Sequence, residues 1–426
     1  MLNFDDNNNV IRDEKSRAIL VGVSTGEDIS YSMQELEGLA EAAGVEILAQ
    51  MVQNVEKINA GTYIGTGKLQ ELKEACAAME ADLVIFNDEL SGMQLRNIED
   101  CVDVKVIDRT ILILDIFASR ATSAEGKLQV ELAQLSYRLP RLLGFGKSLS
   151  RLGGGIGTRG PGETKLETDR RHIQRRMDDI KASIKDLSSN RSVQRAKREK
   201  SEIPVVALVG YTNSGKSSVM NRMLSENDKD DKKVFEKNML FATLDTAQRL
   251  ITLDDRHSFI LVDTVGFVSK LPHTLIEAFK STLEEAVRAD LLVQVVDASY
   301  DQKEFYIDVT NSVLKELHAD AKPMITAFNK CDLLEDGKEI IGFGNDSVVI
   351  SAKTGEGFDE LLTKIADKIF DKTREVSLLI PFTKGDVLSA ILAKNRPIET
   401  IYREDGTLIR LELSDADIGR YEEFLV

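Results

Sequence analysis

The chain has 426 residues, more than one hydrophobic core usually serves, and it is 42% hydrophobic and 30% charged, which is typical of a soluble globular protein with several domains. It has no apolar run of transmembrane length and no segment like a secretory signal at its N-terminus, so we expect a cytoplasmic protein without a membrane span. The net charge of −16 argues at first against a nucleic-acid partner, and three distant cysteines argue against a disulfide framework or a zinc site.

Residues 1–118 are predicted to form a small α/β domain. Short apolar runs alternate there with amphipathic stretches, a pattern that is typical of a parallel sheet covered by helices. The predicted strands are residues 17–24, 45–51, 81–87 and 104–108, and the predicted helices are residues 33–43, 68–80 and 92–101.

Residues 119–200 are predicted to form a helical linker, in which two antiparallel helices are joined by a glycine-rich loop. Apolar residues recur at intervals of three and four, which gives each helix one apolar seam. The loop, residues 146–165, is not expected to be helical, and the second helix is expected to fade into a charged linker over residues 188–204. The seams are Leu128, Leu132, Leu135 and Leu139 in the first helix and Ile173, Met177, Ile180, Ile184 and Leu187 in the second.

The net charge is unevenly distributed along the chain. Between Arg138 and Lys200 there are 17 lysines and arginines against 7 aspartates and glutamates, so this segment is basic although the whole chain is acidic. A basic insert in an acidic chain is typical of a protein that binds a polyanion through one part. The glycine-rich loop at the tip of the helical pair is the expected point of contact.

The last two predicted domains are residues 201–371 and residues 372–426. Strands and helices alternate again in the first of them, as in the N-terminal domain. The second is predicted to be a small α+β unit that ends in a hairpin, with Asp405-Gly406 at the turn.

A phosphate-binding loop is predicted from Gly210 to Ser217. The stretch VVALVGYTNSGKSS places Gly210, four further residues and then Gly215-Lys216-Ser217 between a strand and a helix. Glycines let backbone N–H groups curl around phosphates, Lys216 neutralises the phosphates, and the Ser217 hydroxyl ligates Mg²⁺. The motif therefore predicts binding of a nucleoside triphosphate. The predicted contacts also include Tyr211, Thr212, Asn213, Ser214 and Ser218.

Two later segments supply predicted contacts to Mg²⁺ and to the γ-phosphate. The segment FATLDT supplies Phe241 and Thr243, with Thr243 as a second Mg²⁺ ligand and Thr246 as the alternative. In VDTVGF, Asp263 closes an apolar run and is expected to reach Mg²⁺ through a water molecule. The N–H group of Gly266 is expected to bind the γ-phosphate.

The base of the nucleotide is predicted to be guanine. In AFNKCD, Asn329 can tether the phosphate-binding loop, Lys330 can lay its stem on the base, and Asp332 can accept hydrogen bonds from the N1–H and N2–H groups of guanine. Adenine lacks this pair of donors and would leave a buried carboxylate unpaired. GTP is therefore the predicted substrate, with GDP as the product. The last loop expected to contact the base is Ser351, Ala352 and Lys353.

Beside these motifs, the stretches GFGKSLSRLGGGIGTRGPG, RGPGETKLETDRR and YIGTGKLQEL make the chain resemble the HflX family of GTPases from about residue 17 to residue 371. The resemblance implies an α/β fold, with a P-loop GTPase domain preceded by a small parallel α/β domain and an antiparallel helical linker and followed by a small α+β domain. It also implies binding to the large ribosomal subunit and its ribosomal RNA, and GTP-dependent splitting or rescue of stalled ribosomes under stress. We expect ribosomes to stimulate GTP hydrolysis, and we expect a monomer.

Phe267 occupies the position where many GTPases place a glutamine that orients the attacking water. A phenylalanine cannot take that role, and two replacements are open. Asn213 can ligate K⁺ beside the phosphates, or the ribosome can order the loops around Thr243 and Gly266 from outside. The predicted catalytic residues are Lys216, Thr243, Gly266 and Asn213.

Three alternatives remain open from the sequence. The first is a GTPase that acts in assembly of the large ribosomal subunit, and the second is an RNA-processing enzyme timed by GTP, although residues 1–118 show no evident metal cluster or nucleophile with a base. The third is a stand-alone RNA-remodelling activity that uses ATP at the N-terminal domain, although no helicase motif is evident; ATP binding by this domain has been proposed for the family. The stretch IGTGK, residues 64–68, opens a predicted helix and resembles a phosphate site, but it lacks the full spacing of a phosphate-binding loop.

Overall fold

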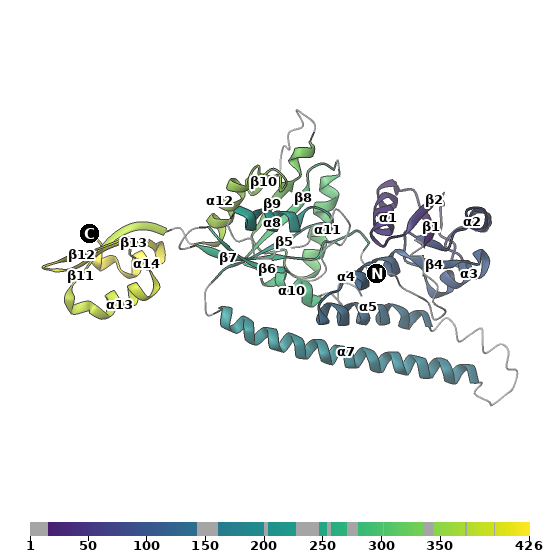
Figure 1. Cartoon of the computed structure of the whole chain (residues 1–426), viewed down its shortest axis with the longest axis horizontal. Coiled ribbons are helices and arrows are strands. Elements are labelled where there is room, and N and C mark those ends of the chain that lie inside the picture. Colours follow the sequence, from purple (N-terminus) through teal and green to yellow (C-terminus); the bar gives the residue numbers. More distant parts are fainter. Residues whose placement is uncertain are drawn as a thin grey trace, which may run out of the picture.

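The computed structural model describes residues 16–142, 161–199, 203–226, 247–253, 257–270, 280–300, 302–334, 344–370, 373–395 and 397–426. They contain a four-stranded, a six-stranded and a three-stranded sheet. Figure 1 shows the six-stranded sheet between the other two, with two long helices along one side. Within the described residues, no helix is both long enough and apolar enough to cross a membrane.

The N-terminal domain is a parallel sheet covered on both faces. Its strand order is β2-β1-β3-β4, and all three neighbouring pairs are parallel. Helices α1 and α4 contribute to the core on one face, and α2 and α3 contribute to the core on the other, which explains why β1 and β3 are almost wholly buried apolar runs. The strands are β1 (Arg17–Ser24), β2 (Glu46–Asn54), β3 (Leu83–Phe86) and β4 (Lys105–Asp108), and the helices are α1 (Ser30–Ala42), α2 (Thr66–Met79), α3 (Gly92–Val102) and α4 (Arg109–Arg120).

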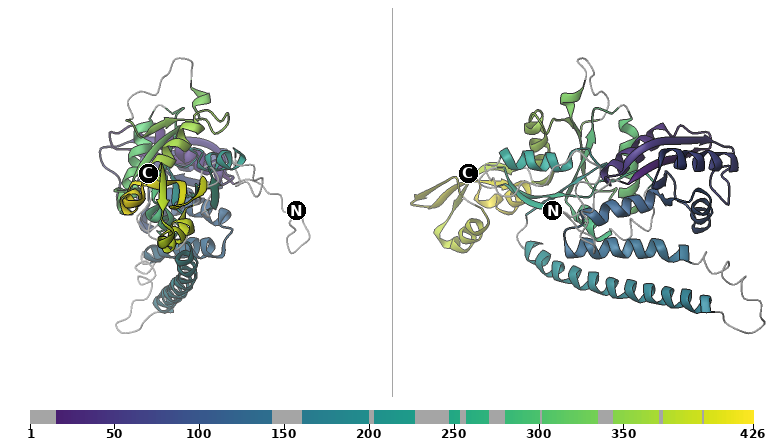
Figure 2. Two further views of the ribbon diagram at one scale, coloured as in Figure 1. Left: turned by 90° about the vertical axis from the view of Figure 1, so that its left-hand side faces the viewer. Right: turned by 45° about the vertical axis from the view of Figure 1, so that its right-hand side comes forward.

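The two long helices are α5 (Ala124–Leu142) and α7 (Pro161–Glu199), which run antiparallel and side by side in Figures 1 and 2. Met177 and Ile180 of the predicted seam are buried, and Arg176 of α7 pairs with Glu131 of α5 at 2.7 Å. A second face of α5 was not predicted. Val130, Ala133 and Tyr137 lie on that face and are buried in the core of the N-terminal domain.

Two predicted boundaries of the second helix were wrong. Residues 161–165 were expected to belong to a non-helical loop, but α7 begins at Pro161, where proline is well tolerated because the first helical N–H has no partner within the helix. Residues 188–199 were expected to be a linker, yet α7 continues to Glu199, since Arg, Lys, Gln, Glu and Ala are good helix formers. The rest of the glycine-rich loop lies outside the described residues.

The six-stranded sheet has the order β10-β9-β8-β5-β7-β6, and only the β6–β7 pair is antiparallel. Helices α8 and α12 pack on one face, and α10 and α11 on the other. The carboxyl ends of the parallel strands meet at one edge, where ligands bind in such sheets. The strands are β5 (Val205–Val209), β6 (Ala247–Thr252), β7 (Ser258–Asp263), β8 (Leu291–Asp297), β9 (Met324–Asn329) and β10 (Ser347–Val349), and the helices are α8 (Lys216–Glu226), α10 (Lys280–Arg288), α11 (Lys303–Glu316) and α12 (Phe358–Ile369), with a 3-10 turn η2 (Cys331–Leu333).

The C-terminal unit is an antiparallel sheet of order β11-β13-β12 with short helices. The predicted hairpin turn was displaced by one residue. Glu404 and Asp405 form the turn, whereas Gly406 begins β13 and pairs with Arg403. A Cβ at Gly406 would lie 2.4 Å from the Ile380 carbonyl oxygen, so only glycine fits. The elements are β11 (Thr373–Ile380), η3 (Phe382–Lys384), α13 (Gly385–Lys394), β12 (Glu399–Arg403), β13 (Gly406–Ser414), α14 (Asp415–Arg420) and η4 (Glu422–Phe424). The predicted fold class is confirmed.

Candidate functional site

The predicted phosphate-binding loop connects β5 to α8 at the carboxyl edge of the six-stranded sheet. Gly210 and Gly215 have φ values of +144° and +93°, a region that favours glycine. A Cβ at Gly210 would lie 2.3 Å from the Val295 carbonyl oxygen, and one at Gly215 would lie 2.2 Å from the amide nitrogen of Asn329. The two glycines of the motif therefore allow the loop to pack against β8 and against the loop after β9.

Lys216 lies at the centre of this loop and is buried. Its Nζ donates hydrogen bonds to the carbonyl oxygens of Gly210, at 3.1 Å, and of Tyr211, at 2.8 Å. Burial lowers the pKa of Lys216 to about 8, and the nearby Asp263 carboxylate partly opposes this shift. Because a buried ammonium group is stabilised by negative charge, the site favours a phosphate at this position.

Ser217 and Asp263 provide oxygen ligands of the kind that Mg²⁺ prefers. The Ser217 hydroxyl donates to the Asp263 carboxylate at 2.6 Å, and Asp263 is fully buried at the end of β7. A hydroxyl beside a carboxylate fits a Mg²⁺ ion that is bound together with phosphates. The predicted ligand Thr243, together with Phe241 and the alternative Thr246, lies outside the described residues.

The residues predicted to contact the base lie together at the ends of β9 and β10. Asn329 donates from its amide nitrogen to the Ser214 carbonyl oxygen at 2.9 Å, and its amide oxygen accepts a hydrogen bond from the Ala352 N–H at 3.0 Å. Asp332 accepts a hydrogen bond from the Ser351 hydroxyl at 2.6 Å. The two contacts of Asn329 join the phosphate-binding loop, the loop after β9 and the loop after β10 into one site. Lys353 forms an ion pair with Asp332 at 3.6 Å.

Lys330 has a partner that sequence reasoning missed. Its Nζ donates to the Asn213 carbonyl oxygen at 2.9 Å and pairs with Asp297 at 2.7 Å. Asp297 is the last residue of β8 and follows the apolar run LLVQVV. This position could have predicted it as a site residue, because residues at the carboxyl ends of parallel strands lie at the same edge of the sheet.

Gly266 and Phe267 lie directly against the phosphate-binding loop. The Phe267 N–H donates to the Gly210 carbonyl oxygen at 3.1 Å, and the Thr212 N–H donates to the Phe267 carbonyl oxygen at 2.7 Å. The Phe267 side chain is 2% exposed and packs in the core with α10 and α11. Its ring therefore points away from solvent, and it does not take the place of a glutamine that orients water.

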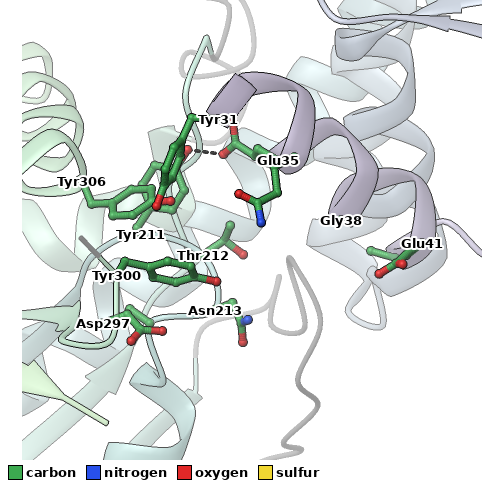
Figure 3. A pocket seen from close by; sticks show the side chains of 13 residues that line it. Tyr31, Glu35, Gly38, Glu41, Tyr211, Thr212, Asn213, Asp297, Tyr300 and Tyr306 are labelled. Atoms are coloured by element: carbon green, nitrogen blue, oxygen red, sulfur yellow. Dashed lines mark hydrogen bonds between the residues drawn. The ribbon is translucent and has the colours of Figure 1, made fainter. Parts of the chain in front are cut away.

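The N-terminal domain covers the outer side of the phosphate-binding loop. A cavity of about 280 Å³ lies between α1 and this loop, and Figure 3 shows side chains from both domains around it. No sequence pattern predicted this arrangement, because the lining residues lie far apart in the chain. The labelled residues are Tyr31, Glu35, Gly38 and Glu41 from α1, Tyr211, Thr212 and Asn213 from the loop, and Asp297, Tyr300 and Tyr306 from β8, the segment after it and α11.

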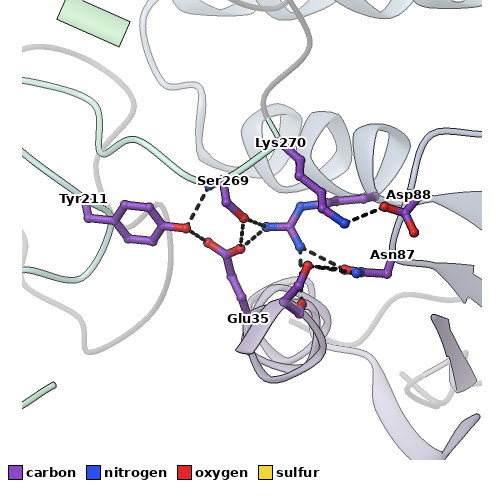
Figure 4. Close-up of polar contacts among 8 residues, drawn as sticks. Glu35, Asn87, Asp88, Tyr211, Ser269 and Lys270 are labelled. Atoms are coloured by element: carbon purple, nitrogen blue, oxygen red, sulfur yellow. Dashed lines mark hydrogen bonds and ion pairs between the residues drawn. The ribbon is translucent and has the colours of Figure 1, made fainter. Parts of the chain in front are cut away.

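Glu35 of α1 is the centre of a polar cluster between the two domains, which Figure 4 shows. Its carboxylate pairs with Arg109 and accepts hydrogen bonds from the hydroxyl groups of Tyr211 and Ser269. Burial raises the pKa of Tyr211, and the neighbouring Glu35 carboxylate raises it further, so the Tyr211 hydroxyl stays protonated and donates. A second ion pair, between Lys270 and Asp88, lies beside this cluster.

The suggested second phosphate site in the N-terminal domain has other contacts. Gly65 precedes α2, and its N–H donates to the side-chain oxygen of Gln53 at 2.9 Å. Lys68 pairs with Glu71 on the same helix at 2.8 Å. The N–H group and the ammonium group that would bind a phosphate there are thus both engaged by protein side chains.

Family models match most of the chain. They are described as GTP-binding GTPase N-terminal, over residues 30–118, GTP-binding GTPase Middle Region, over residues 120–198, and 50S ribosome-binding GTPase, over residues 205–330. A crystal structure of SsGBP in complex with GDP is 25% identical and covers 82% of this chain and 97% of that chain, with a TM-score of 0.45.

Curated relatives match over nearly the full length. A GTPase HflX from Caldanaerobacter subterraneus subsp. tengcongensis is 47% identical over 97% of this chain and 94% of the relative. A GTPase HflX from Lacrimispora saccharolytica is 45% identical over 94% of each chain. Identity at this level, over sequences that include the nucleotide motifs, shows that the chain binds GTP and GDP, with Mg²⁺, and hydrolyses GTP. The chain therefore belongs to the HflX family of GTPases.

Proposed function

We propose that this GTPase binds the large ribosomal subunit and uses GTP to split or rescue stalled ribosomes under stress. The observation that carries the proposal is the basic segment between Arg138 and Lys200, with 17 lysines and arginines against 7 aspartates and glutamates in an otherwise acidic chain. Helix α7, which makes up most of the described part of this segment, extends beside α5 along one side of the molecule (Figure 2), where ribosomal RNA can reach its exposed arginines. The matching model of a 50S ribosome-binding GTPase supports the same partner.

The proposed roles in the nucleotide site are those expected from the sequence motifs, and the contacts described above support the roles of Lys216, Ser217 and Asn329. Lys216 and the backbone N–H groups from Gly210 to Ser218 bind the phosphates, and the N–H of Gly266 binds the γ-phosphate. Ser217 and Thr243 would hold Mg²⁺ with support from Asp263, and the ion would neutralise part of the phosphate charge. Asp332 reads the guanine edge, while Asn329, Lys330, Ser351, Ala352 and Lys353 support the base.

The buried ring of Phe267 leaves the orientation of water to other groups. We propose that the ribosome orders the loops around Thr243 and Gly266 and thereby raises a slow intrinsic rate of GTP hydrolysis by orders of magnitude. Asn213 is proposed to ligate K⁺ beside the phosphates, because it lies in the phosphate-binding loop and lines the cavity next to it. Equal rates in potassium and sodium buffers would remove the K⁺ proposal, and an unchanged rate with added large subunits would remove the ribosomal one.

We propose four domains, residues 1–118, 119–200, 201–371 and 372–426, in a cytoplasmic monomer that associates with ribosomes. The ends of the matched family models at residues 118, 120, 198 and 205 support the first two boundaries. ATP binding by the N-terminal domain gains no support from Gly65 and Lys68, which already contact Gln53 and Glu71.

The experiment that tests the proposed function is sedimentation of intact ribosomes with this protein and a non-hydrolysable GTP analogue, beside GTP and GDP. Dissociation into subunits, with the protein on the large one, is the expected result. Intact ribosomes without bound protein would contradict splitting. Binding to precursor particles alone would instead establish a role in assembly of the large subunit.

A further inference from the structure

The segment after Asp263 forms a backbone bridge with the phosphate-binding loop. Tyr211 and Phe267 pair as an isolated parallel β-bridge. The bridge consists of the Phe267 N–H bond to the Gly210 carbonyl oxygen and the Thr212 N–H bond to the Phe267 carbonyl oxygen, at 3.1 and 2.7 Å. It fixes Gly266, the residue that we assign to the γ-phosphate, against the loop that binds the other phosphates.

This bridge packs Gly266 closely against Lys216 and the phosphate-binding loop. A Cβ placed on Gly266 would lie 2.6 Å from the Thr212 Cα and 3.0 Å from the Lys216 Nζ. A phosphoryl oxygen that accepts hydrogen bonds from Gly266 and from Lys216 needs to lie about 2.9 Å from each nitrogen, and the phosphorus and its other oxygens need further space. Movement of Gly266 away from the loop therefore increases the space for a γ-phosphate that binds both groups.

The N-terminal domain holds the bridge at both of its strands. Tyr211, on the loop strand, donates to Glu35, and Ser269, two residues after Phe267, also donates to Glu35. The Ser269 N–H donates to the Tyr211 hydroxyl at 2.7 Å, so the two strands are joined through their side chains as well. One carboxylate of α1 thus contacts Tyr211 of the bridge directly and the segment of Phe267 through Ser269.

The anchoring carboxylate is itself fixed in the N-terminal domain. Arg109, which is 2% exposed, pairs with Glu35 and donates to the Ser269 hydroxyl at 3.1 Å. The same guanidinium donates to the side chain of Asn87, which is buried at the end of β3. Glu35 is therefore not able to follow Ser269 and Tyr211 if they move, unless its contact with Arg109 breaks.

We propose that Glu35 is a positioning residue that makes the nucleotide site discriminate against the γ-phosphate, so that the docked N-terminal domain favours GDP over GTP. The inference rests on the nucleotide-site assignment of the proposed function. Loss of the Glu35 contacts frees Gly266 to move, which improves binding of a triphosphate and leaves binding of a diphosphate unchanged. Coupling between sites typically changes affinity by about five- to 150-fold.

The test is to measure the dissociation constants of GDP and of a non-hydrolysable GTP analogue for the full chain and for Glu35→Gln, by calorimetry with Mg²⁺. The expected result is an affinity for the analogue that rises about tenfold, with a change of less than about twofold for GDP. Glu41→Gln is the matched control, because Glu41 lies on the same helix, lines the same cavity and is exposed. It should change neither constant.

Ser269→Ala provides a second variant that removes one hydroxyl and leaves the buried Arg109–Glu35 pair in place. Ser269→Ala should also raise the affinity for the GTP analogue relative to that for GDP, but by a smaller factor than Glu35→Gln. An equal change in both constants would mean that Glu35 only supports the fold of the loop, and an unchanged ratio or a shift toward GDP would overturn the proposal. No ribosomes are used, so this result is independent of whether the protein splits them.

Discussion

Lys216 contributes a buried positive charge to the nucleotide site, and its Nζ donates to the backbone carbonyl oxygens of Gly210 and Tyr211. Lys216→Ala should therefore lower nucleotide affinity by at least about tenfold, because hydrogen bonds to charged groups contribute about 1.5–3 kcal/mol each. A fluorescence titration with a labelled GDP measures this. Lys322→Ala is the control, since Lys322 also donates to a backbone carbonyl oxygen, that of Ala289, away from the site. Wild-type affinity in Lys216→Ala would contradict the assigned loop.

Asp332 is placed to read the base, because its carboxylate faces the site while the Ser351 hydroxyl holds one of its oxygens. Asp332→Asn presents a donor in place of an acceptor, and xanthine has a carbonyl oxygen where guanine has an amino group. The preference for guanosine over xanthosine diphosphate should fall by at least about a hundredfold, measured by competition binding. Glu356→Gln, an exposed change nearby, should leave the preference intact. Retained guanine selectivity in Asp332→Asn would exclude the base-reading role.

Residues of the nucleotide motifs could be predicted because their roles are tied to local spacing. The glycines of the phosphate-binding loop and the AFNKCD segment each follow a strand, so their meeting at one sheet edge follows from the parallel topology. Glu35 could not be predicted in this way. Its contact with Tyr211 joins residues 176 positions apart in different domains, and no local pattern specifies how two domains dock.

At the scale of elements, α5 shows that an apolar repeat can predict one packing face of a helix and miss another. The leucine seam indicated the contact with α7, but the same helix buries Val130, Ala133 and Tyr137 on another face, against the N-terminal domain. Alanine and tyrosine are not recognised in the sequence as part of an apolar repeat, so the contact of α5 with the N-terminal domain was not predicted. Helix α7 was predicted too short for a related reason, since its last twelve residues lack any apolar period and only their helix propensity indicates structure.

Tyr137 anchors α5 to the end of β4. Its hydroxyl donates to Asp108, a fully buried carboxylate that also accepts from the N–H groups of Leu90 and Ile111, each at 3.0 Å. Tyr137→Phe removes one donor to this buried group and should lower the free energy of unfolding by about 1–2 kcal/mol, measured by urea denaturation. Tyr402→Phe is the control, because Tyr402 is 78% exposed. Equal stability of both variants would show that the hydroxyl contributes nothing.

At the scale of the whole molecule, charge is separated from the catalytic site. The net negative charge lies in the chain outside residues 138–200, while helix α7 of the basic segment extends along one side of the molecule (Figure 1). This separation lets the protein contact a polyanion through α5 and α7 without exposing its nucleotide site to the same polyanion. The charge distribution was visible in the sequence, but the straight extent of α7 became visible only in the structure.

The exposed arginines near the start of α7 are placed to contact ribosomal RNA. Arg170→Glu, Arg171→Glu and Arg175→Glu together should weaken binding to large ribosomal subunits and make it less dependent on salt, because each lost phosphate contact reduces the slope of log affinity against log salt by about 0.7–0.9. Filter binding at several KCl concentrations measures both. The ion pair of Arg171 with Glu167 is exposed and contributes little to stability, so the fold should persist.

The matched control reverses three exposed lysines outside α5 and α7, Lys57→Glu, Lys73→Glu and Lys105→Glu, with the same change in net charge. If α7 acts through local phosphate contacts, this control retains the wild-type affinity and the wild-type slope of log affinity against log salt. Both triple variants should keep the wild-type rate of GTP hydrolysis measured without ribosomes. If both variants lose affinity equally, net charge alone governs association. The assignment of the contact to α7 would then be wrong, although the protein would still bind a polyanion.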